Sequence, residues 1–153
     1  MGIIEAAYRN FCKERFSLPT EQQIADLERR IGVALPQDYR EFILGYNGGY
    51  FDEPNIVPVI EGCPRDGLDS LFGIGSTHPS SELASEFYLD LFDDNYPVEV
   101  LPIGGTPLGA LILLITHPED RGAIMLKVAF GDSYFLARGI DGFFERLREP
   151  EAG

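Results

Sequence analysis

Two short helices joined by a tight corner are predicted by the apolar and polar pattern of residues 18–49. Thr20 and Gln23 form a capping-box pattern at the start of the first helix, and Gly32 suits its end because glycine tolerates a positive φ. Three apolar residues recur at the spacing of one helix face: Ile24, Leu27 and Ile31. We therefore expect this face to lie in the core.

The second of these helices is predicted to begin at Leu35 and Pro36, since proline fits the first turn of a helix. Its apolar residues share one wide face: Tyr39, Phe42, Ile43 and Tyr46. Asn47, Gly48 and Gly49 can end the helix because they tolerate positive φ. The corner between the two helices is interpreted as core rather than as an active site.

Three more helices are predicted, at the start, middle and end of the chain. The N-terminal helix has one apolar face and is expected to end near Phe16; that face consists of Ile4, Ala7, Tyr8 and Phe11. The middle helix is expected to run from Ser80 or Ser81 to about Phe92, and the last from Ile140 to Arg148.

Six strands are predicted from runs of apolar residues bounded by turn residues: 56–60, 68–74, 98–103, 110–115, 123–128 and 133–136. Residues 50–55 are expected to be a loop, and Pro58 to confine its strand to a sheet edge. The continuously apolar run 110–115 is expected to be the central strand, covered on both faces. Because the strands do not alternate regularly with helices, we predict an α+β fold with a mostly antiparallel sheet.

Composition favours one soluble domain that spans residues 1–153. Hydrophobic residues make up 44% of the chain and charged residues 24%, which is ordinary for a globular protein. The N-terminus lacks the basic-then-apolar pattern of a signal peptide, and the longest apolar run is too short to cross a bilayer. We expect a cytoplasmic protein, in agreement with two cysteines that show no paired spacing.

The net charge of −13 and the isoelectric point near 4.4 restrict the class of partner. Nucleic acids and anionic membranes require clustered lysine and arginine, so neither is expected to bind. A strongly acidic protein instead attracts basic partners.

The order of motifs resembles that of the SUKH superfamily, which includes yeast regulators of cell-wall synthesis and many bacterial immunity proteins. The first block of matching residues is Leu27, Glu28, Ile31, Gly32, Leu35, Pro36, Asp38, Tyr39, Phe42, Asn47, Gly48 and Gly49. Weaker matches are residues 71–73, 101–104 and 143–147, so the resemblance covers about residues 18–149. The chain departs from the family at Ala110, where many members carry an acidic residue after the glycine.

The resemblance implies a SUKH-like fold and a protein that binds other proteins without catalysis. In bacteria it implies an immunity protein that binds a cognate toxin, commonly a nuclease, and blocks it stoichiometrically. An acidic surface could occupy the basic site at which a nuclease meets phosphate. A regulatory scaffold for endogenous protein partners, as in the yeast members, is the alternative.

Acidic residues are segregated between Asp66 and Asp120, where ten occur without a single lysine or arginine. Three of them repeat every four residues in the predicted middle helix, an arrangement that costs about 0.2–0.5 kcal/mol per pair. We predict that this region binds the basic partner; the predicted binding residues are Glu82, Glu86, Asp90, Asp93, Asp94 and Glu99, with Tyr88 and Tyr96 as aromatic anchors. An acidic surface that serves only solubility is the alternative.

No motif predicts an enzyme, a cofactor site or a metal site. His78 and His117 each precede a proline in a predicted turn, and neither has metal ligands at a suitable spacing. Cys12 and Cys63 are the conceivable nucleophiles, but no neighbour in sequence would lower their pKa. The acidic pairs 52–53 and 93–94 lack the alternating acids and the glycine of a calcium loop.

Overall fold

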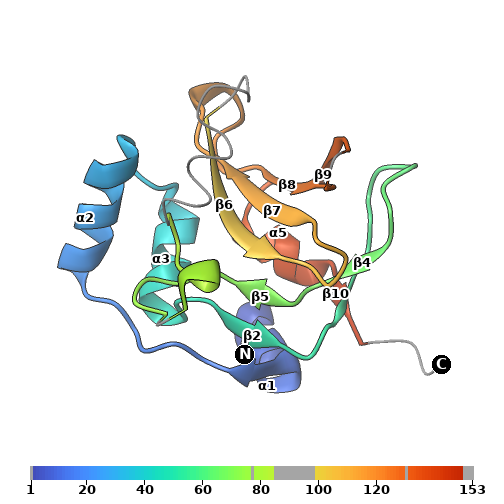
Figure 1. Ribbon diagram of the computed structural model, residues 1–153, viewed down its shortest axis with the longest axis horizontal. Helices are drawn as coiled ribbons and strands as arrows, with labels where there is room; N and C mark the ends of the chain where they lie inside the picture. Colours follow the sequence, from blue (N-terminus) through green and yellow to red (C-terminus); the bar gives the residue numbers. More distant parts are fainter. Residues whose placement is uncertain (1, 77, 85–98, 130, 150–153) are drawn as a thin grey trace.

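A seven-stranded antiparallel sheet forms the body of the molecule (Figure 1). The computed structural model describes residues 2–76, 78–84, 99–129 and 131–149. The strand order is β1-β2-β5-β6-β7-β8-β9. The strands are β1 (Cys12–Glu14), β2 (Gly49–Phe51), β5 (Ser70–Leu71), β6 (Val100–Gly105), β7 (Leu111–Ile115), β8 (Ile124–Lys127) and β9 (Ser133–Ala137). With its helices, this sheet confirms the α+β class.

A second, three-stranded sheet lies beside the first and has the order β10-β3-β4. Its strands are β3 (Asn55–Ile56), β4 (Asp66–Gly67) and β10 (Leu147–Arg148), and both pairings are antiparallel. Leu147 pairs with Ile56, so the end of the chain is fixed against a segment that is about ninety residues earlier in the sequence.

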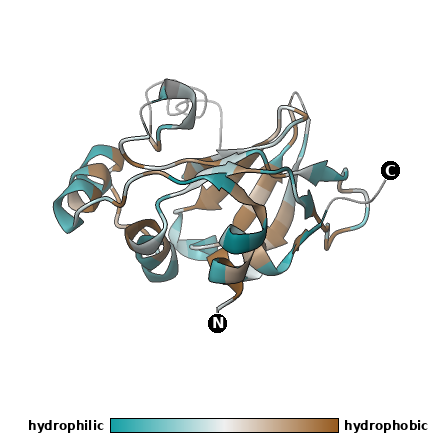
Figure 2. Ribbon diagram, turned by 90° about the horizontal axis from the view of Figure 1, so that it is seen from below, coloured by the Kyte–Doolittle hydropathy of each residue, from teal (hydrophilic) through white to brown (hydrophobic). Residues whose placement is uncertain are grey.

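Helices α1 (Ile3–Phe11), α3 (Gln37–Gly45) and α5 (Ile140–Glu145) contact one another and share a core with the large sheet. An aromatic cluster joins the three helices: the ring centroids of Tyr8 and Tyr46 are 4.6 Å apart, and those of Phe42 and Phe144 are 5.5 Å apart. Helix α2 (Glu21–Ile31) lies at the side of the molecule, and its inward face contributes Ile24 and Leu27 to the same core. Figure 2 shows apolar residues on the strands and polar residues on the outer face of α2.

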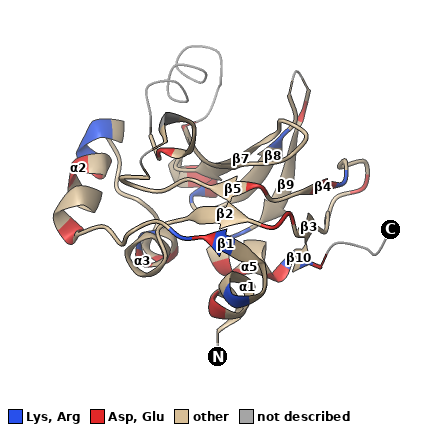
Figure 3. Cartoon of the chain, turned by 60° about the horizontal axis from the view of Figure 1, so that its bottom comes forward, with Lys and Arg blue, Asp and Glu red and all other residues tan. Residues whose placement is uncertain are grey.

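The hairpin of β6 and β7 was correctly predicted, and so was burial of β7 on both faces. Ile112 and Leu113 point to opposite sides of the strand, and both are 0% exposed. The central position in the sheet, however, belongs to β6, with β7 beside it. Charged residues are absent from β2, β5 and β7 and surround the sheet on the helices and loops (Figure 3).

The two helices of residues 18–49 were predicted accurately because their caps are encoded locally. Thr20 and Gln23 form the full capping box, and Gly32 ends α2 with φ 79°. Pro36 is the N-cap of α3 rather than a residue of its first turn. Asn47 and Gly48 follow the helix with φ of 55° and 77°.

Four boundary predictions were wrong, each because a short strand is specified by a distant partner. Helix α1 ends at Phe11 rather than near Phe16, because the next residues form β1. Strand β1 pairs with β2, which overlaps the predicted loop at residues 50–55. Strand β3 is two residues long and central in its sheet, since Pro58 lies outside it. Helix α5 ends at Glu145, before β10.

The middle helix predicted to start at Ser80 or Ser81 does not begin there. A 3-10 helix, η1 (Pro79–Ser81), is followed by Glu82 and by a turn at residues 83–84, in which Ala84 has φ 58°. Glu82 forms an isolated parallel bridge with Gly73, a pairing that is incompatible with a continuous α-helix at this point. Residues 85–92 of the predicted helix lie outside the described residues.

Candidate functional site

Glu82, one of the predicted binding residues, is hydrogen-bonded within the chain. Its Oε2 atom accepts a hydrogen bond from the Gly75 amide at 2.8 Å, and Oε1 accepts from the Ser76 amide at 2.8 Å and the Ser76 hydroxyl at 3.1 Å. The carboxylate is therefore used to hold the 75–82 loop closed. Glu82 lies in an isolated bridge and is followed by a turn at residues 83–84, so it is not part of a helix.

The other predicted binding residues are placed only in part. Glu99 is exposed just before β6, and its carbonyl oxygen accepts a hydrogen bond from the Thr116 amide at 3.0 Å. Six predicted residues lie outside the described part of the chain and stay predictions: Glu86, Tyr88, Asp90, Asp93, Asp94 and Tyr96.

Asn47, in the family-like motif, is buried and connects three segments of the chain through its side-chain hydrogen bonds. It is 0% exposed; its side-chain amide donates to the carbonyls of Ser17 and Ile74 at 2.7 and 2.9 Å, and its Oδ1 accepts from the Ile74 amide at 2.8 Å. Both N–H groups of the side-chain amide thus donate a hydrogen bond and its oxygen accepts one. The three bonds hold three segments of the chain together. No polar atom of this side chain is left to bind a partner.

The glycines beside Asn47 permit close approach of neighbouring backbones. A Cβ atom at Gly48 would lie 2.4 Å from the Leu71 carbonyl oxygen, and one at Gly49 would lie 2.6 Å from that of Glu14. Any larger residue at these positions would push β1, β2 and β5 apart.

The acidic residues of the same motif also bind within the chain. Glu28 accepts a hydrogen bond from the Leu35 amide at 2.7 Å and so secures the corner between α2 and α3. Asp38 accepts from the Ile140 amide at 3.1 Å and so joins α3 to the start of α5. These motif residues thus maintain the architecture.

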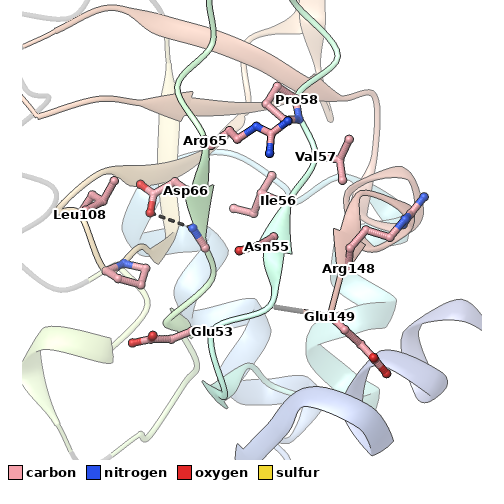
Figure 4. A pocket seen from close by; sticks show the side chains of 12 residues that line it. Glu53, Asn55, Ile56, Val57, Pro58, Arg65, Asp66, Leu108, Arg148 and Glu149 are labelled. Atoms are coloured by element: carbon pink, nitrogen blue, oxygen red, sulfur yellow. Dashed lines mark hydrogen bonds between the residues drawn. The ribbon is translucent and has the colours of Figure 1, made fainter. Parts of the chain in front are cut away.

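A groove of about 610 Å³ crosses the small sheet (Figure 4). We call it the small-sheet groove; its lining comes from residues 53 and 55–58, 65–67, 107–108 and 148–149. Strands β3, β4 and β10 thus contribute to it together with the turn between β6 and β7. Figure 4 places Leu108 at one side of the groove and Val57, Pro58 and Arg148 at the other.

Hydrogen bonds fix the walls of this groove. The Thr106 hydroxyl donates to Asp66 Oδ2 at 2.5 Å and accepts from the Ala110 amide at 3.0 Å, which joins the β6–β7 turn to β4. Arg148 donates to the carbonyls of Glu145 and Leu147 at 2.6 and 2.9 Å, which fixes its guanidinium beside the end of α5. The shape of the groove is therefore fixed by hydrogen bonds within the chain.

Sequence reasoning did not identify this groove, because it brings together four segments that are distant in the sequence. Residues 56–60 were interpreted as a strand at a sheet edge, and residues 104–109 as a hairpin loop. A local signal exists only in retrospect, namely that Leu108 is a large apolar residue in a turn between Pro107 and Gly109.

Neither cysteine thiol has a lowered pKa. Burial raises the pKa of the Cys12 thiol above its ordinary value, and burial with the nearby Asp66 charge raises the pKa of the Cys63 thiol. His117 accepts a hydrogen bond through Nδ1 from the Glu119 amide at 3.3 Å and so caps a 3-10 helix, η2 (Pro118–Asp120). Within the residues described, no group of three or more potential ligands could hold a metal ion.

No helix in the described ranges is both long and apolar enough to span a membrane.

Comparison with known proteins gives one family match and two relatives. The model of the SMI1 / KNR4 family (SUKH-1) matches residues 18–146. The chain is similar to the SPbeta prophage-derived uncharacterized protein YokK of Bacillus subtilis (strain 168), with 27% identity over 156 residues, 88% of this chain and 78% of the relative. It is also similar to the uncharacterized protein YnaB of the same organism, with 30% identity over 88 residues, 48% of this chain and 61% of that relative. No solved structure matches it.

Proposed function

Because the chain belongs to the SMI1 / KNR4 family (SUKH-1), we propose that it is a protein-binding domain of the immunity type. It binds a basic protein toxin and blocks the toxin's active site without catalysis of its own. The observation that carries this proposal is the net charge of −13 on a domain whose family-defining residues are occupied by structural roles. A charge of this size raises the association rate with a basic partner and selects against acidic ones.

The chemistry of the conceivable nucleophiles supports a function without catalysis. A catalytic cysteine normally has a lowered pKa, whereas the pKa values of Cys12 and Cys63 are raised. A nuclease is a suitable toxin class, since its substrate-binding surface must be basic. Occlusion of that surface by an acidic protein requires no reaction.

The proposal is tested by capture followed by neutralisation. The tagged chain is used to isolate binding proteins from a lysate of the source organism, and each captured protein is expressed from an inducible promoter in a host that lacks it. We expect one basic protein that stops growth, and we expect co-expression of this chain to restore growth.

Capture of basic proteins that do not impair growth, or toxicity that this chain does not relieve, would contradict the proposal. Capture of several non-toxic endogenous proteins would favour the regulatory scaffold instead. The double variant Glu86→Lys and Asp90→Lys tests the predicted acidic face in the same assay. Its matched control, Glu119→Lys with Asp120→Lys, changes the charge equally at an exposed turn.

A further inference from the structure

The two edge strands of the large sheet, β1 and β9, differ in how well they are protected against pairing with a further strand (Figure 1). Strand β1 has three residues, two of them charged, and its register is irregular between Cys12 and Glu14. Short length, charge and irregularity all discourage edge pairing. Strand β9 has five residues, none of them charged and none of them proline. It is therefore the edge of this sheet that is open to another strand.

The register of β8 and β9 shows which backbone groups face away from the sheet. The Val128 amide donates to the Asp132 carbonyl at 3.0 Å, so these two residues form a hydrogen-bonded pair beside the turn. Bonded and non-bonded pairs alternate along an antiparallel ladder. Phe135, which lies opposite Met125, therefore points its N–H and C=O groups away from β8. Within the described ranges, no other element forms a hydrogen bond with these two groups.

The side chains at this edge suit an interface. Tyr134 and Phe135 are half-buried, so they present aromatic surface beside the free backbone groups. Aromatic residues without charge are typical of the centre of a protein interface. Asp132 and Arg138 flank the strand, are exposed, and form no ion pair with the described part of the chain. The edge thus carries opposite charges at its two ends and is neutral as a whole, in a chain of net charge −13.

We propose that two copies of the chain pair antiparallel through the β9 edge, so that the outward N–H and C=O groups of Phe135 bond to the backbone of the other copy. The occupant follows from charge complementarity, because an antiparallel copy reverses the order of the ends. Asp132 of each copy then lies at the end where the other copy carries Arg138, whereas a parallel copy would bring like charges together. This pairing goes beyond the proposed function and needs no toxin.

Charge reversal tests the pairing without disturbing the fold, since both flanking side chains are exposed. Asp132→Arg and Arg138→Asp each place like charges at both ends of the paired strands. Mixed in equal amounts, the two variants should form a heterodimer, because each end then has one arginine and one aspartate again. Glu14→Arg and Lys13→Asp are the matched controls, since they make the same changes of charge on the opposite edge, β1.

The measurement is sedimentation equilibrium of the full chain over a series of concentrations, after circular dichroism has shown that each variant is folded. We expect the wild type to dimerise with a dissociation constant below about 1 mM. Each charge reversal should raise this constant about five- to thirtyfold, and the controls should leave the constant near that of the wild type. The equimolar mixture should return to the wild-type constant.

Amide hydrogen exchange locates the contact on β9. The Phe135 amide should exchange more slowly as the wild-type concentration rises, and it should not do so in either charge reversal alone. A tagged wild-type chain saturated with the captured toxin provides the comparison with a different occupant.

Four results would overturn the proposal: a monomer at every concentration, equal weakening in the β1 controls, a mixture that does not associate, or a dimer in which the Phe135 amide exchanges as in the monomer. Protection of this amide only when the toxin is bound would identify a strand of the toxin as the occupant, and this too would overturn it. Growth rescue by a chain that stays monomeric would leave the proposed function standing and refute only the self-pairing.

Discussion

Asn47 shows how a short polar residue can define a fold from within. It adopts a left-handed conformation with φ 55°, which asparagine tolerates better than most residues, and its side chain bonds to Ser17 and Ile74. Sequence alone indicated the conformation, because asparagine before two glycines is typical of a helix end. It could not indicate the three hydrogen bonds, since their partners lie 27 and 30 residues away.

The two cysteine thiols should react slowly, and their reaction should require a higher pH than that of an exposed cysteine. Burial raises the pKa of both thiols, so the reactive thiolate is a smaller fraction at any given pH. The Cys12→Ser and Cys63→Ser variants each leave one thiol, whose rate of alkylation by iodoacetamide is measured as a function of pH. The midpoint of each rate curve should therefore lie at a higher pH than the midpoint for glutathione. A midpoint below that of glutathione for either thiol would indicate an activated nucleophile and would contradict a non-catalytic function.

At the scale of elements, the accuracy of prediction followed how local each signal is. Helices α2 and α3 have caps within a few residues of their ends, and both were predicted to within about two residues. Strands β1, β3 and β10 have only two or three residues each, and each is defined by a partner distant in sequence. The small-sheet groove depends on those strand pairings, so it could not be predicted from the sequence for the same reason.

Gly73, two residues after β5, approaches Asn47 so closely that it should not tolerate a side chain. A Cβ atom there would lie 2.2 Å from the Asn47 carbonyl oxygen and 2.7 Å from Phe16 Cδ2. We expect Gly73→Ala to lower the free energy of unfolding by about 1–3 kcal/mol, as measured by urea denaturation.

Gly45→Ala is the matched control, because no atom lies within 4 Å of a Cβ atom at that position in α3. Alanine is the better helix former, so this variant should be unchanged or more stable by up to about 1 kcal/mol. Equal stability of the two variants would show that Gly73 does not approach Asn47 as described.

At the scale of the whole molecule, the residues that hold the fold together are distinct from those that carry most of the surface charge. The family motif holds α2, α3, α5 and the sheet together, while the surface carries the net charge of −13. Acidity was evident from composition, but the location of the small-sheet groove was not.

Titration of the captured toxin's activity with this chain tests the central claim most directly. A non-catalytic immunity protein should reduce the activity linearly to zero at a whole-number molar ratio, with no further change on longer incubation. The complex should return active toxin when it is dissociated in denaturant and the toxin is refolded alone. Complete inactivation by a small fraction of an equivalent, or a permanently altered toxin, would show that the chain acts as an enzyme and would contradict the account.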